Sequence, residues 1–121
     1  MTARQPTAQE REVLAAFVRL EISIPALCEE LHGMLNVSFG RQERRLTSHL
    51  LPAEPAIRIE MQHIENAMDR HRRGEISTCE LSDWAAMLLM NDAYGWEGPD
   101  EDKIADLLNR LSAPSLYEKP V

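Results

Sequence analysis

Hydrophobic residues recur every three or four positions in five stretches of the chain, which is the spacing of amphipathic helices. The predicted helices cover residues 7–20, 23–35, 55–73, 78–91 and 100–113. The fourth is apolar over most of its circumference, so we expect it at the centre of the fold. The pattern predicts an all-α protein, a compact bundle of about five helices that forms a single domain over residues 1–121.

Two of the predicted helix boundaries share one design. Gly74 suits the end of one helix, and Ser77 with Glu80 forms a capping box at the start of the next. Residues 19–27 repeat the arrangement, since Arg19, Glu21, Ile22, Ser23 and Leu27 recur as Arg73, Glu75, Ile76, Ser77 and Leu81. We therefore expect two similar helix–corner–helix units, produced either by a duplication or by the shared demands of a helix corner.

The helical spacing fails between residues 36 and 55, where we expect an irregular connection. Within it, residues 36–40 favour a short extended piece, and residues 46–51 favour a helical turn before Pro52. Residues 1–6 and 115–121 lack a periodic apolar pattern, and we expect both ends to be loose.

The excess of negative over positive charge lies entirely in the C-terminal part of the chain, residues 74–121. The net charge is −7, and residues 1–73 are balanced, with ten basic and ten acidic side chains. Such a field repels nucleic acid and anionic lipid and favours a basic protein partner. We expect no nucleic acid and no membrane as partners. The alternative is that the acidity serves only solubility.

Candidate chemistry is sparse. Motifs that bind nucleotides or activate a serine are absent, and no acidic loop has calcium-site spacing, so we expect no metal and no cofactor. Cys28 and His32 are four residues apart and could meet on one helix face, while Cys79 lies near a helix N-terminus. These residues leave open a small thiol-dependent enzyme or redox sensor. Without a secretory signal or membrane span, we expect a cytoplasmic protein with reduced cysteines.

The loop after the fourth predicted helix carries the strongest candidate for a binding site. It places two aromatic side chains among carboxylates: Asp92, Tyr94, Trp96, Glu97, Asp100, Glu101 and Asp102. Tyrosine and tryptophan are frequent interface anchors, and acidic neighbours steer a basic partner. The alternative is that Trp96 folds back onto the core.

Three features carry a resemblance: the run Gly-Glu-Ile-Ser-x-x-Glu-Leu-Ser-Asp-Trp-Ala at 74–85, Asp92, and Leu-Ser-Ala-Pro at 111–114. The chain resembles small, uncharacterised bacterial helical proteins, some of which resemble immunity partners of bacterial toxins. The resemblance implies a non-enzymatic protein–protein interaction module, an immunity-like or regulatory binder, and it carries over no catalytic residue. A third interpretation is a structural homo-oligomer that uses apolar surface left on the helix at 78–91.

Overall fold

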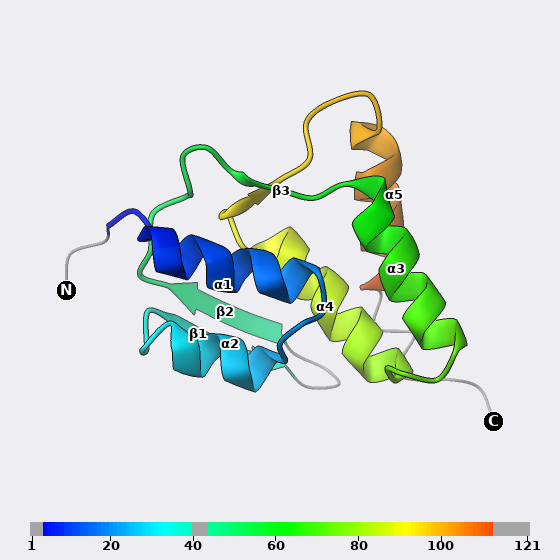
Figure 1. The fold of residues 1–121 in the computed structure, drawn as a ribbon, viewed down its shortest axis with the longest axis horizontal. Helices are drawn as coiled ribbons and strands as arrows, with labels where there is room; N and C mark the ends of the chain where they lie inside the picture. The colour runs from blue at the N-terminus through cyan, green and yellow to red at the C-terminus, as the bar shows by residue number, and fades with distance from the viewer. Residues whose placement is uncertain (1–3, 40–43, 113–121) are drawn as a thin grey trace.

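The computed structural model describes residues 4–39 and 44–112, which form helices and short strands (Figure 1). Its elements are α1 (Ala8–Val18), α2 (Ile24–Glu30), β1 (Leu35–Phe39), β2 (Arg44–Ser48), β3 (Ile57–Arg58), α3 (Met61–Arg72), α4 (Thr78–Met90), β4 (Tyr94–Gly95) and α5 (Glu101–Leu111). Five helices agree with the sequence pattern. The prediction of an all-α fold is wrong, because the described residues also contain four strands in two small sheets.

The first sheet is an antiparallel hairpin in which Leu35 lies opposite Ser48. The helix predicted over 23–35 ends early because His32 and Gly33 both have left-handed backbone angles, with φ of 50° and 82°. Side chains then alternate between buried and exposed positions, as a strand requires. The extended piece expected at 36–40 lies largely within β1, whereas the helical turn expected at 46–51 is wrong, because that segment begins inside β2.

The second sheet joins two segments that are distant in sequence. β3 pairs in parallel with β4, with Ile57 opposite Tyr94 and Arg58 opposite Gly95. The backbone amide of Ile59 continues the pairing by donating to the carbonyl of Gly95 at 2.9 Å. The helix expected from residue 55 therefore begins later, at Met61. The residues before it alternate between buried and exposed, and their partner strand lies beyond α4.

The two predicted corners share their backbone hydrogen bonds and a serine cap, although only Ser77 is part of a capping box. Ser23 and Ser77 each cap the following helix, by accepting from the amides of Ala26 and Glu80. At the first corner the amide of Leu20 donates to the carbonyl of Phe17, and that of Glu21 to Ala16. At the second corner the amides of Gly74 and Glu75 repeat both bonds onto His71 and Arg70. These bonds are those of a Schellman motif, and Leu20 and Gly74 adopt its left-handed position with φ of 61° and 77°.

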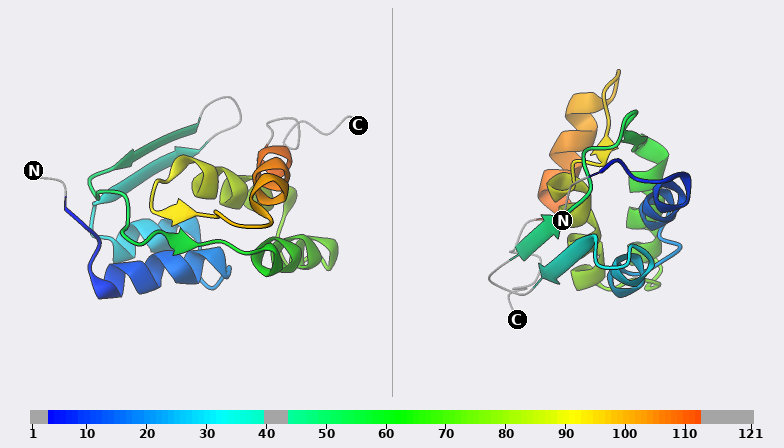
Figure 2. Two further views of the ribbon diagram at one scale, coloured as in Figure 1. Left: turned by 90° about the horizontal axis from the view of Figure 1, so that it is seen from above. Right: turned by 90° about the vertical axis from the view of Figure 1, so that its left-hand side faces the viewer.

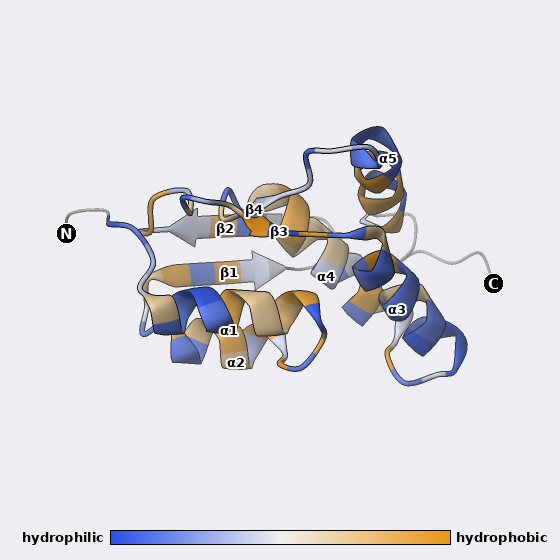
Figure 3. Cartoon of the chain, turned by 45° about the horizontal axis from the view of Figure 1, so that its top comes forward, coloured by the Kyte–Doolittle hydropathy of each residue, from blue (hydrophilic) through white to orange (hydrophobic). Residues whose placement is uncertain are grey.

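α4 lies in the middle of the molecule, as its apolar surface predicts. Figures 1 and 2 place α1, α2 and the hairpin on one side of it and α3 and α5 on the other. Trp84 is 1% exposed, and its indole Nε1–H donates to the carbonyl of Phe17 at 3.2 Å. Figure 3 shows that the surrounding helices carry hydrophilic and hydrophobic residues on different sides. A single cluster of buried side chains therefore joins α4 to its neighbours.

Residues 1–6 were expected to be loose, but hydrogen bonds hold Arg4, the first described residue, against the rest of the protein. Arg4 forms two hydrogen bonds with the carboxylate of Glu10, at 2.7 and 2.9 Å, and its carbonyl accepts from the amide of Leu51. Of the residues that were expected to be loose, 1–3 and 115–121 lie outside the described residues. Within the described ranges, the helices are too short or too polar to cross a membrane.

Candidate functional site

The residues predicted to form a binding site do not form one continuous surface. Asp92 lies just after α4 and lines a groove beside Met90 and Leu51. Trp96 and Asp100 line a different hollow, which is bordered by the segment that leads into α3. The structure thus separates Asp92 from the rest of the predicted site.

Tyr94 belongs to the core. Its side chain is 6% exposed, and its hydroxyl donates to the carbonyl of Leu14 at 2.8 Å. Burial raises the pKa of the phenol, because an ionised oxygen would lack solvent. The pairing of β4 with β3 holds this segment against α1, so Tyr94 is not the surface anchor that the sequence suggested.

The remaining residues form a surface that we call the acidic edge: Trp96, Glu97, Asp100, Glu101 and Asp102. The four carboxylates are exposed, and within the described part of the chain none of them forms an ion pair or a side-chain hydrogen bond. Asp100 is the N-cap residue of α5, and its backbone carbonyl accepts from the amide of Ile104, but its carboxylate accepts no hydrogen bond from a helix amide. Glu101 and Asp102 lie in the first turn, where negative charge is favourable.

Trp96 forms one wall of a hollow of about 380 Å³ within the acidic edge. The indole is partly buried and packs against the core, while Met61 and Ile104 add apolar surface to the same hollow. Arg58 also lines it, and its guanidinium lies only 2.8 Å from where a side-chain carbon on Gly98 would stand. The hollow therefore combines an aromatic wall, carboxylates at its border and the guanidinium of Arg58.

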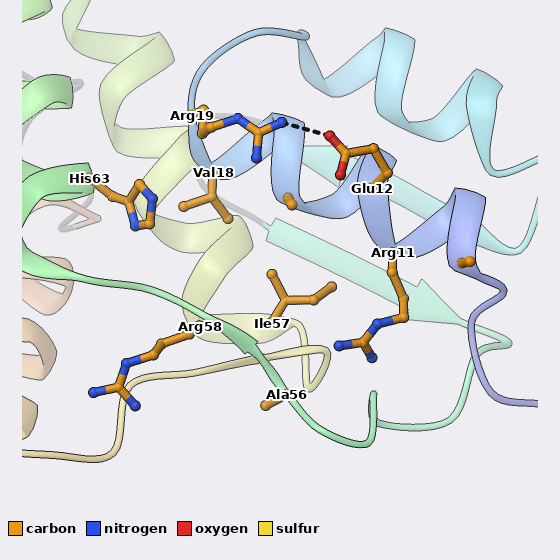
Figure 4. A pocket seen from close by; sticks show the side chains of 10 residues that line it. Arg11, Glu12, Val18, Arg19, Ala56, Ile57, Arg58 and His63 are labelled. Carbon is orange, nitrogen blue, oxygen red and sulfur yellow. Dashed lines mark hydrogen bonds and ion pairs between the residues drawn. The ribbon is translucent and has the colours of Figure 1, made fainter.

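A second surface was not predicted from the sequence. We call it the arginine pocket, a cleft of about 420 Å³ between α1 and β3 that is lined by Arg11, Arg19, Arg58, His63 and an apolar floor. Figure 4 shows Arg11 and Arg58 on opposite sides of Ile57. The positions on α1 share one face, but nothing local in the sequence indicates that β3 lies across from them.

The charges of the arginine pocket are only partly compensated. Arg19 is paired with Glu12 and Glu21, each at 2.8 Å. Within the described ranges, Arg11 and Arg58 form neither an ion pair nor a side-chain hydrogen bond. The lining thus includes two guanidinium groups with no acceptor among the described residues, in a protein whose net charge is −7.

His63 faces the arginine pocket as a neutral ring. Its Nδ1 accepts a hydrogen bond from the amide of Glu60 at 2.9 Å, as part of the capping box of α3. Burial lowers the pKa of His63, and the charge of Arg19 acts in the same direction against that of Glu60. With Nδ1 accepting, the ring hydrogen resides on Nε2, which is then a donor.

The structure does not bring the candidate thiol chemistry together. α2 ends at Glu30, so His32 lies beyond the helix that was expected to align it with Cys28. Burial raises the pKa of Cys28, which lowers its thiolate fraction. Cys79 is exposed on α4. Among the described residues, no group of three or more His, Cys, Asp or Glu side chains is arranged to hold a metal ion.

Comparison of the chain with models of known protein families, with curated proteins and with solved structures finds no match in any of the three.

Proposed function

We propose that this chain is a non-enzymatic binding protein that recognises a basic protein partner through the acidic edge. The observation that supports the proposal is the set of exposed carboxylates that follow the partly buried Trp96 in the chain and form no ion pair among the described residues, with Asp100 in the same hollow as Trp96. An immunity-like or regulatory binder, which neutralises or controls a basic protein by contact, is the specific form that we propose.

The carboxylates supply the long-range part of recognition. Like charges on one exposed surface create a field that attracts a positively charged partner and raises the association rate. Because these side chains form no ion pair with any described residue, binding a cation requires none of the described ion pairs to break. The electrostatic contribution falls as salt screens the field beyond about 10 Å at 0.1 M.

The hollow supplies the short-range part. A lysine or arginine side chain entering it would lay its aliphatic stem against Trp96 and Met61 and bring its charge to Asp100. Trp96 is already packed against the core, so little side-chain freedom is lost when a partner covers it. An ordered aromatic group of this kind is the type of residue that slows dissociation.

The test begins with the capture of a partner from the host lysate, followed by binding kinetics with the purified partner. Trp96→Ala should speed dissociation at least about tenfold, because it removes the wall of the hollow. Leu51→Ala is the matched control, since Leu51 is an exposed apolar residue away from the acidic edge. Equal dissociation rates for the two variants would refute the role of this surface.

A homo-oligomer is a second candidate function, favoured by one observation. Met90 on α4 and Leu51 are 39% and 42% exposed and line the same groove beside the hairpin. Two large apolar side chains in one groove are suited to burial against a second copy. Sedimentation should then show a dimer that Met90→Ser weakens, whereas a monomer at all concentrations would exclude this candidate.

A further inference from the structure

We infer that Arg58 is a specificity-determining residue of the hollow beside Trp96, and that the partner segment which fills this hollow carries a carboxylate next to its basic side chain. This role rests on the proposed function and narrows the partner's chemistry, because it distinguishes the basic segments that the hollow accepts from those that it rejects.

Arg58 places a positive charge in an otherwise acidic surface. The pairing of β3 with β4 sets Arg58 opposite Gly95, and Figure 4 shows its side chain extending away from Ile57. Its Nη2 atom lies 2.8 Å from the position that a Cβ on Gly98 would take. Gly98 has a φ of 141°, which favours glycine. The residue that this backbone requires therefore also leaves the space that the guanidinium occupies.

The other charged side chains that line the hollow are the carboxylates of Glu60 and Asp100. Among the described residues, Arg58 forms an ion pair with neither of them. Arg58 is exposed, so water can solvate its N–H donors in the free protein. The hollow thus presents one cation and two anions that no ion pair joins, around the apolar surface of Trp96.

A partner that covers the hollow removes water from Arg58 as well as from the carboxylates. A guanidinium that loses its water without gaining an acceptor weakens binding, because a buried charge needs a hydrogen-bonding partner. A segment with only basic side chains supplies no carboxylate and adds repulsion. A carboxylate on the partner could instead accept two hydrogen bonds from the guanidinium fork while the neighbouring lysine or arginine binds Asp100.

NMR titration of the full chain with two blocked tripeptides tests this role: acetyl-Lys-Gly-Glu-amide and acetyl-Lys-Gly-Gln-amide. Side chains two positions apart in an extended chain point to the same side, so both can enter one hollow. The peptides differ only in the charge near the lysine, and the indole N–H signal of Trp96 reports binding. An ionic strength of about 0.15 M screens charges more than about 8 Å away. The native protein should bind the glutamate peptide at least about threefold more tightly than the glutamine peptide.

Arg58→Gln should abolish this preference, because glutamine removes the positive charge and keeps a polar side chain. Arg11→Gln is the matched control, since it removes an equal charge that forms no described ion pair and does not line the hollow. It should keep the preference of the native protein.

Three outcomes would overturn the role of Arg58: no preference in the native protein, a preference that persists in Arg58→Gln, or no saturable shift of the Trp96 signal with either peptide. Binding of both peptides without discrimination would leave the proposed function standing. The proposed function is decided separately, by the kinetics of the captured partner with the Trp96→Ala and Leu51→Ala variants.

Discussion

The hydroxyl of Tyr94 should contribute to stability and not to partner binding. Tyr94→Phe removes only the oxygen that donates to the carbonyl of Leu14 at 2.8 Å, and it leaves the buried ring in place. This bond joins β4 to α1 across 80 positions of sequence. The sequence alone assigned Tyr94 to the binding surface, so the variant separates the two interpretations.

The expected loss can be worked from the contacts. Leu14 lies inside α1, so its carbonyl keeps the amide of Val18 as a helical partner after the hydroxyl is removed. The cost is therefore that of one hydrogen bond, about 1 kcal/mol, and not that of an orphaned carbonyl. Tyr94→Ala should cost about 3–5 kcal/mol, because it also empties the volume of a 6%-exposed ring.

Urea unfolding followed by circular dichroism measures both losses, and the partner-binding assay provides the comparison. Tyr94→Phe should lower the free energy of unfolding by about 1 kcal/mol while its affinity for the partner stays unchanged. If Tyr94→Phe left stability intact and weakened binding, Tyr94 would be a surface anchor.

Three further predictions concern the frame around the site. Trp84→Ala should lower the free energy of unfolding in urea by about 3–5 kcal/mol, because it empties the centre of the core and removes the hydrogen bond to Phe17. A loss below about 1 kcal/mol would refute the central position of Trp84. Gly74→Ala should lower the free energy of unfolding by about 1 kcal/mol in the same assay, because the φ of Gly74 is 77°. The space around Gly74 is open, so backbone strain is the sole cause of this loss. An unchanged unfolding midpoint would contradict the corner geometry. Burial lowers the pKa of His63 in the folded state. The unfolded chain therefore binds more protons than the folded chain as pH falls through about 6.5. The contribution of neutral His63 to the free energy of unfolding is thus complete above that pH and is lost below it. His63→Gln keeps a capping side chain without titrating, so identical pH profiles of stability for the variant and the native protein would refute the assignment.

The helix boundaries were predictable because their causes are local. The serine caps and the left-handed residue before each of them act within a few positions, so the corners at Ser23 and Ser77 could be read from the chain directly. The predicted end of α2 and the predicted start of α3 were wrong because their causes are not local. Whether residues near 35 or 57 extend as strands depends on partners that lie further along the chain.

Only the part of the proposed binding surface that depends on local sequence could be predicted. The composition of the loop after α4 identified the exposed acids, but it could not show that pairing with β3 buries Tyr94 and leaves Trp96 at the edge. Asp92 was grouped with the acids because of sequence proximity, although the fold places it beside Met90. The arginine pocket was missed altogether, because Arg11 and Arg58 line one cleft only when β3 lies across α1.

The most direct test of the proposed function is the association rate with the partner as a function of salt concentration. Glu101→Gln/Asp102→Asn removes two charges from the acidic edge, and Glu29→Gln/Glu30→Gln removes two exposed charges from α2 as the matched control. We expect the first variant to associate more slowly than the native protein at low salt, and we expect this difference to shrink as salt increases. The control should associate like the native protein. Equal association rates for the two variants at every salt concentration would contradict the proposal.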